Sequence, residues 1–187
     1  AGFPFTREHA LLLRSCEAKE GEKLMQGIFG PSFDYYAIRE RRRELVRERL
    51  AQYGLEKKPG VEETLRFLRA KGIKTAVATA TALDITKSHL TTIGVYDLFD
   101  SIVSAKNVAH GKPEPDVYLY ACEQIGERPQ DCMAVEDSPN GIMAAYRAGL
   151  RTVMVPDLTQ PDEELTKYLY ACVNSLSDLC ELVDKED

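Results

Sequence analysis

The stretch Cys132-Met-Ala-Val-Glu-Asp-Ser-Pro-Asn-Gly141 combines three features that together decide the fold. Its first four residues are apolar, which predicts a short buried strand at 132–135. Two carboxylates follow directly, and then Pro139, a residue favoured in the first turn of a helix, so we predict a helix at 140–148. A strand that turns directly into a helix is the repeating unit of a parallel α/β sheet.

The same alternation extends in both directions from this stretch. We predict strands at 74–79, 101–104, 132–135, 152–155 and near 171–173, and helices at 61–70, 85–93, 115–125, 140–148 and from 177 onward. Strands that alternate with helices form a parallel sheet with helices on both faces. Because such sheets bind ligands beyond the carboxyl ends of their strands, we expect the functional residues there.

The N-terminal part of the chain shows helical periodicity and no strand pattern up to about residue 53. Thr6 is a candidate N-cap for a first helix, and Ser32 for a longer one that Gly54 would end. The longer helix mixes Arg and Glu from residue 39 to 49, which favours a solvated, salt-bridged face over an anion-binding patch.

A segment rich in turn formers and charge, Gly54-Leu-Glu-Lys-Lys-Pro-Gly60, separates this helical part from the α/β part. Such segments mark domain boundaries, since few regular elements tolerate them. We therefore predict two domains, at 1–56 and 57–187.

Two strand ends carry polar residues suited to an anion. The strand at 74–79 ends on Thr79, whose hydroxyl and the amide of Ala80 behind it offer two donors to a phosphate. Lys112 lies on a proline-stiffened loop, Gly111-Lys-Pro-Glu-Pro-Asp116, which would hold its charge in place. Each feature also has a plainer interpretation, because threonine is a good strand former and a loop lysine is usually exposed.

The adjacent carboxylates Glu136 and Asp137 leave two interpretations open. They repel each other without a cation, and hard oxygen ligands of this kind suit Mg²⁺, which takes one or two carboxylates and keeps several waters. Alternatively, Asp137 or Ser138 caps the helix that follows. Capping accounts for one carboxylate and leaves Glu136 unexplained.

A hydroxyl, a lysine and an acidic pair thus stand, in that order, at the carboxyl ends of strand–helix units. This constellation resembles the haloacid dehalogenase superfamily, specifically its β-phosphoglucomutase-like branch with a helical cap inserted near the N-terminus. Thr79 matches the second motif of the family, Lys112 the third, and Glu136-Asp137-Ser138 with Gly141 the fourth.

The resemblance is close from residue 60 to about 156 and implies an α/β fold. The expected architecture is a Rossmann-like, three-layer parallel-sheet core at 57–187, with the C-terminal part of the helical cap at 1–56. The family's first motif, Asp-x-Asp at the end of the first strand, occurs nowhere in the 187 residues. The chain opens in what resembles the middle of the cap, so we expect the first strand to be missing from it.

In the resembled fold, the missing strand is the central one, between the strands that end at Thr79 and Val135. We predict that these two strands do not pair with each other, because closing the gap would force the helices on both faces to repack. We also predict that a missing N-terminal segment of the same protein fills the gap, since bare strand edges inside a core are costly.

The resemblance implies displacement at phosphorus by an Asp carboxylate, giving an aspartyl phosphate that is hydrolysed or passes its phosphoryl group on. Mg²⁺ would be held by Asp137 and, directly or through water, by Glu136. Lys112 would offset negative charge, and Thr79 with the Ala80 amide would bind the phosphoryl oxygens. The cap would close over the site and select the leaving group.

Phosphatase and mutase differ in two places within the resembled branch. Its mutases carry Lys-Asn after the second motif and an Arg in a cap loop, where this chain has Ala82-Leu83 and the Arg-free Gly27-Ile-Phe-Gly-Pro31. We therefore favour a phosphatase of small phosphorylated metabolites such as sugar phosphates. A sugar-phosphate mutase, or a catalytically inactive fragment or binding module, remains the alternative.

Composition excludes several other classes. The formal net charge of −6 argues against nucleic-acid and anionic-membrane partners, and no apolar run approaches the length of a membrane span. Five cysteines without a Cys-x-x-Cys pair indicate free thiols in a reducing compartment, with Cys122, Cys132 and Cys172 buried in apolar runs. We expect a cytoplasmic monomer.

Overall fold

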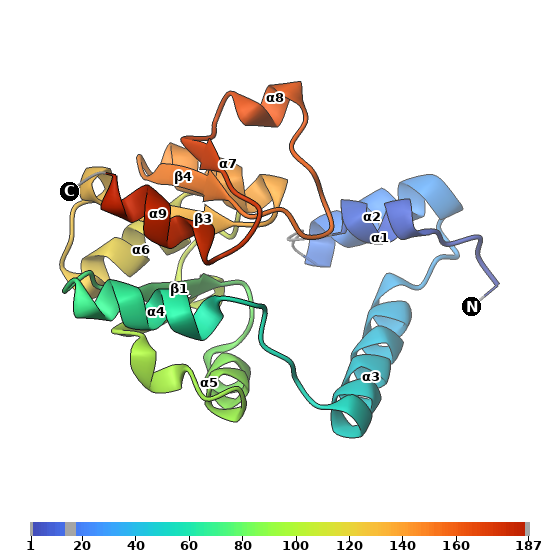
Figure 1. Ribbon diagram of the computed structural model, residues 1–187. Helices are drawn as coiled ribbons and strands as arrows, with labels where there is room; N and C mark the ends of the chain where they lie inside the picture. The colour runs from blue at the N-terminus through green and yellow to red at the C-terminus, as the bar shows by residue number, and fades with distance from the viewer. Residues whose placement is uncertain (1, 14–17, 186–187) are drawn as a thin grey trace. The chain divides into compact units, whose positions relative to one another are not determined.

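The computed structural model describes residues 2–13 and 18–185. The chain divides into two compact units, Ala1–Glu56 and Lys57–Asp187, and each is described by itself (Figure 1). Cys16, one of the five cysteines counted in the sequence, lies outside the described residues.

The first unit is helical, with α1 (Arg7–Leu12), α2 (Ala18–Phe29) and α3 (Tyr35–Tyr53). Met25, Phe33 and Tyr35 form its buried centre. The cap of α3 differs from the sequence prediction: Asp34, and not Ser32, accepts the backbone N–H of Ala37 at 3.0 Å. Ser32 lies in the turn before α3, so its hydroxyl precedes the helix by too many residues to cap it.

The charged face of α3 is salt-bridged, as predicted. Arg41 pairs with Glu44 at 2.9 Å, and Arg47 pairs with Glu40 at 2.7 Å, with all four side chains about half exposed or more. Solvent screens such pairs, so they contribute little to the stability of the helix. The helix ends at Gly54, whose backbone N–H donates to Leu50 O, also as predicted.

The second unit alternates helices and strands. Its elements are α4 (Val61–Ala70), β1 (Ala76–Thr79), α5 (Leu83–Thr92), η1 (Tyr96–Leu98), β2 (Ser101–Ser104), η2 (Ala105–Asn107), α6 (Asp116–Ile125), η3 (Pro129–Asp131), β3 (Met133–Glu136), α7 (Pro139–Arg147), β4 (Arg151–Met154), α8 (Glu163–Thr166), β5 (Ala171–Cys172) and α9 (Asp178–Asp184). The predicted strands are all present within two residues of their expected positions. Among the described residues of this unit, α8 is the one α-helix without a counterpart in the prediction.

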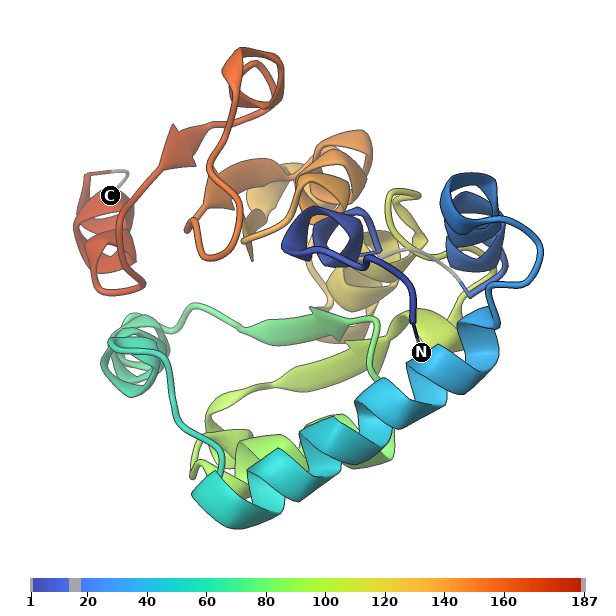
Figure 2. The same ribbon diagram turned by 90° about the vertical axis from the view of Figure 1, so that its right-hand side faces the viewer.

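The strands form two parallel groups, β1–β2 and β3–β4–β5. Among the described residues, β1 and β3 are not hydrogen-bonded to each other, as predicted, and the ribbon in Figure 2 shows the two groups apart. Both strands are incompletely covered: all four residues of β1 are half-buried, and Val135 in the middle of β3 is 40% exposed. A strand inside a finished α/β sheet is normally buried on both faces.

Helices hold the two groups of strands together. One buried cluster joins Val103 of β2 and Ala134 of β3 through residues of α6 and α7, among them Val117 and Ala144. In Figure 1, α6 lies behind the strands while α4 and α9 lie in front of them. The hydroxyl of Thr64 on α4 donates to Leu176 O at 2.9 Å, which ties α4 to the segment before α9.

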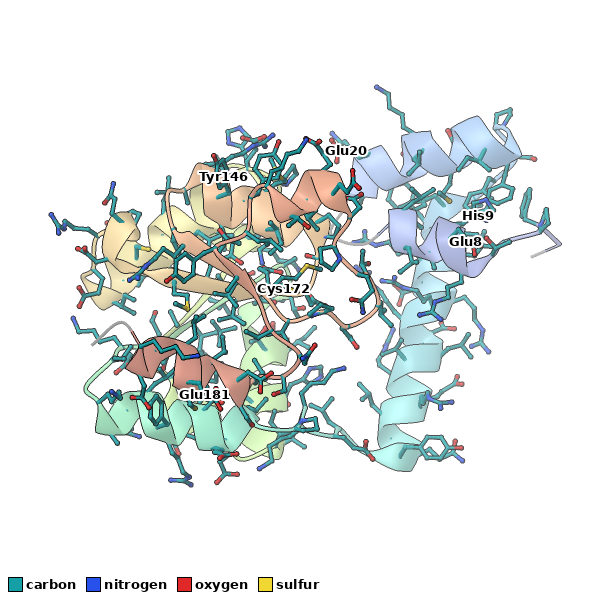
Figure 3. All side chains as sticks on the ribbon, turned by 45° about the horizontal axis from the view of Figure 1, so that its top comes forward. Glu8, His9, Glu20, Tyr146, Cys172 and Glu181 are labelled. Atoms are coloured by element: carbon teal, nitrogen blue, oxygen red, sulfur yellow. The ribbon has the colours of Figure 1, made fainter. Side chains whose placement is uncertain are left out.

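The described cysteines are free thiols, and the prediction of their burial is right in part. Cys122 is buried and Cys132 half-buried, but Cys172 is exposed (Figure 3). Its strand, β5, has only two residues and lies at the edge of its sheet, with a neighbouring strand on one side only. In the described part of the chain, no helix combines the length and apolar character needed to cross a membrane.

Candidate functional site

The polar strand ends meet at one edge of the second unit. Thr79 is the last residue of β1, and Glu136 is the last residue of β3. The side chain of Lys112, from the loop before α6, connects the two strands: its Nζ donates to Ala78 O at 3.1 Å and to Glu136 Oε1. The lysine side chain thus bridges β1 and β3.

Lys112 is buried, which overturns the plainer interpretation of an exposed loop lysine. Its side chain is 9% exposed and that of Glu136 is 8% exposed. From α7, Arg147 Nη1 holds the lysine loop by donating to Pro113 O at 3.0 Å and Glu114 Oε1 at 2.9 Å. A buried ammonium is retained only where it is paired, so this ion pair is an integral part of the local fold.

The carboxylate of Glu136 is surrounded by donors. Oε1 accepts from Lys112 Nζ and the Tyr118 hydroxyl, while Oε2 accepts from Ser138 Oγ at 3.2 Å and the Asp137 N–H at 3.3 Å. An ionised carboxylate offers about four lone-pair positions, and protein groups fill them here. Glycine at 141 makes this possible, because a Cβ there would overlap the carboxylate of Glu136.

Tyr118 is the site residue that sequence reasoning missed. It lies on α6 with 6% of its surface exposed, and its hydroxyl donates to Glu136 Oε1. Burial, and then the neighbouring charge of Glu136, raise the pKa of this hydroxyl well above its usual range, so it remains a donor. In the sequence, Tyr118 is one of several apolar residues of a helix, and no local pattern marks it.

The residues after β3 distinguish between the two interpretations of the acidic pair, helix capping and metal binding. Ser138 is the N-cap of α7 and accepts the Gly141 N–H at 3.2 Å, so capping does not need Asp137. Asp137 is half-buried beside the Glu136 carboxylate. Its hard oxygens suit Mg²⁺, but no group of three or more His, Cys, Asp or Glu that could hold a metal is found among the described residues.

The end of β1 forms a compact turn with polar groups turned inward. Thr79 Oγ1 accepts the Thr81 N–H at 3.1 Å, which leaves the hydroxyl its own proton to donate. Ser104, which lies opposite Thr79 on β2, donates its hydroxyl to Thr81 O at 2.7 Å. The turn is therefore fixed, and Ala80 follows β1 at an exposed position.

A hollow of about 390 Å³ lies elsewhere, at the amino end of β2, and is lined by Lys87, Asp97 and Asp100 with Tyr96, Phe99, Ser101 and Ile102. In a parallel sheet this is the edge opposite the strand ends that carry Thr79 and Glu136. Ligands of such sheets bind at the carboxyl ends of the strands, so this hollow does not mark the candidate functional site.

The second unit is thus a parallel α/β core with a lysine and an acidic pair at its strand ends. The chain belongs to the family of haloacid dehalogenase-like hydrolases, whose pattern matches residues 20–149. This confirms the family that the motifs predicted.

Three known proteins illustrate the similarity. YhcW of Bacillus subtilis (strain 168) is 40% identical over 116 residues, which cover 61% of this chain and 53% of that protein. Hexitol phosphatase B of Escherichia coli (strain K12) is 33% identical over 128 residues, 68% of this chain and 56% of that protein. The chain thus spans little more than half the length of these curated relatives.

A solved structure, β-phosphoglucomutase from Clostridium difficile, is similar with a TM-score of 0.79 and 22% identity. The alignment covers 99% of this chain and 83% of that one. At this identity the likeness shows the fold: an α/β core with parallel strands and a helical unit.

Proposed function

We propose that the protein containing this chain is a Mg²⁺-dependent phosphatase of small phosphorylated metabolites, such as sugar phosphates, that acts through an aspartyl phosphate. The observation that carries this proposal is the buried Lys112–Glu136 pair, with Asp137 beside it, at the carboxyl ends of β1 and β3. The name of the Escherichia coli relative, hexitol phosphatase B, supports the substrate class. We also assign the helical unit to a cap.

Each residue has a distinct proposed role. The Thr79 hydroxyl and the Ala80 amide donate to phosphoryl oxygens, and the ammonium of Lys112 offsets the charge that gathers around phosphorus. Asp137 offers Mg²⁺ an anionic oxygen, and Glu136 acts through water, because its own oxygens already accept protein donors. Bound Mg²⁺ would neutralise phosphate charge and orient the substrate.

The nucleophile is proposed to come from a strand between β1 and β3 that the 187 residues do not contain. Three facts support this: the facing edges of these strands are unpaired in the described structure, Val135 is 40% exposed, and the sequence has no Asp-x-Asp. A central strand would satisfy the backbone groups of both edges and bring a carboxylate next to Lys112.

The test uses p-nitrophenyl phosphate and a hexitol phosphate with the full-length protein. Asp137→Asn should lower kcat/KM by orders of magnitude and weaken Mg²⁺ activation, because it removes an anionic ligand and keeps the shape. The matched control is Asp131→Asn, at the opposite end of β3, where the carboxylate pairs with Arg128 at 2.6 Å in solvent. Unchanged Mg²⁺ dependence in Asp137→Asn would refute the proposed metal site.

The 187-residue chain alone provides a second test. It should fail to hydrolyse either substrate at any Mg²⁺ concentration, since it lacks the proposed nucleophile. Turnover by the purified chain, abolished by Lys112→Ala in the same preparation, would show that the nucleophile lies within these residues.

A further inference from the structure

The ammonium of Lys112 has three N–H groups, and the structure gives each an acceptor. These are Ala78 O at 3.1 Å, the Tyr118 hydroxyl at 3.4 Å, and Glu136 Oε1. The proposed reaction requires the same ammonium to donate to a phosphoryl oxygen. One of the three acceptors must therefore be exchanged when a phosphorylated substrate binds.

The three acceptors differ in how readily they can be given up. Glu136 is charged and buried, so separating it from the ammonium is costly. The Ala78 carbonyl belongs to β1 and would lose its lysine donor, a cost for a backbone group that is shielded from water. The Tyr118 hydroxyl is neutral and makes the longest contact, and it is the acceptor most easily replaced.

Packing also fixes the position of the Tyr118 hydroxyl. Tyr118 belongs to the buried cluster that joins the strands to α6 and α7, and its ring lies 4.9 Å from Lys112 Nζ. While the hydroxyl accepts from Lys112, its own proton goes to Glu136 Oε1. One side chain therefore contacts both members of the ion pair, from a helix that packing holds rigid.

We propose that Tyr118 is a positioning residue for phosphoryl transfer. When the site is empty, its hydroxyl accepts a hydrogen bond from Lys112. When substrate binds, a phosphoryl oxygen replaces the hydroxyl as the acceptor for Lys112. In both states the hydroxyl donates to Glu136. The carboxylate thus stays in position while the ammonium turns toward the substrate. This role rests on the function proposed above and adds a residue that the family motifs in this chain do not include.

The first experiment is Tyr118→Phe in the full-length protein, with Tyr120→Phe as the matched control. Tyr120 lies on the same helix, is half-buried against the same cluster, and has no place in the site. In Tyr118→Phe, kcat should fall about tenfold or more, since a hydrogen bond to a charged group is lost. KM should stay the same or decrease, because the empty site loses an acceptor that the occupied site does not use.

A double-substitution cycle separates positioning from general damage. If Tyr118 acts through Glu136, adding Tyr118→Phe to Glu136→Gln should lower kcat further by less than about threefold. Losses that multiply would mean that the two residues act independently and would overturn the role. An effect of Tyr118→Phe no larger than that of Tyr120→Phe would overturn it as well.

The Asp137→Asn variant shows which proposal has failed. If Asp137→Asn and Lys112→Ala lose activity but Tyr118→Phe keeps its kcat, only the positioning role is wrong. If Asp137→Asn and Lys112→Ala also retain activity, the proposed function fails and the role fails with it.

Should Tyr118→Phe not fold, NMR of the wild-type protein decides the question. The hydroxyl proton of a ring-labelled Tyr118 should be visible as a slowly exchanging signal, because it is buried and hydrogen-bonded. Saturating inorganic phosphate with MgCl₂ should shift this signal while leaving it protected. A signal that phosphate does not move would refute the exchange of acceptors.

Discussion

Gly141 offers a sharp test of the site, because its lack of a side chain leaves room for the Glu136 carboxylate. A Cβ at residue 141 would overlap the carboxylate carbon and both of its oxygens. In Gly141→Ala the carboxylate must move, and Lys112 then loses its charged partner in a place where its side chain is 9% exposed. The substitution should therefore separate a buried ion pair although neither Lys112 nor Glu136 is replaced.

The magnitude follows from two opposing effects. Removing one partner from a buried ion pair costs about 3–5 kcal/mol. Because residue 141 lies inside α7, alanine recovers about 1 kcal/mol of helix propensity. The net expectation is a decrease of roughly 2–4 kcal/mol in the free energy of unfolding.

The assay is urea denaturation followed by circular dichroism, with Gly27→Ala as the matched control. Gly27 also lies inside a helix, α2, and nothing among the described residues comes within 4 Å of a Cβ there. That variant should gain up to about 1 kcal/mol from helix propensity alone. If Gly141→Ala is as stable as Gly27→Ala, the carboxylate does not lie against residue 141 and our description of the site is wrong.

Three further predictions concern the surroundings of the site and the caps. Arg147→Gln should lower kcat a few-fold by loosening the loop that it holds, yet change the unfolding free energy by less than about 1 kcal/mol, since its ion pair is solvent-exposed. Asp34→Ala should destabilise the protein by about 1 kcal/mol and Ser32→Ala by almost nothing in the same urea assay, and equal effects would contradict the assigned cap. Burial raises the pKa of the Cys122 thiol to about 12, so at pH 8 iodoacetamide should modify the exposed Cys172 and spare Cys122, as peptide mass mapping would show.

The sequence alone determined the order of the elements and predicted which polar residues stand at the ends of the strands. Short segments rich in strand formers, each followed by a helical pattern, predict parallel strands, because parallel neighbours are usually connected by a crossover helix. Thr79, Lys112 and the acidic pair stand after strands or in strand–helix loops, and the carboxyl ends of parallel strands share one edge. Local pattern and elementary topology were sufficient for these features.

Only the tertiary structure decided which of these groups touch and how. The burial of Lys112 depends on Ala78 and Glu136, which are 34 and 24 residues away along the chain. Tyr118 has the sequence signal of an ordinary core aromatic, and its hydroxyl matters because packing of α6 brings it to the ion pair. The need for glycine at residue 141 is likewise visible only in the structure, where the carboxylate of Glu136 lies against that residue of α7. Contacts between distant segments follow from the packing of side chains. They produce no periodic pattern of apolar and polar residues in the sequence, so the sequence could not reveal them.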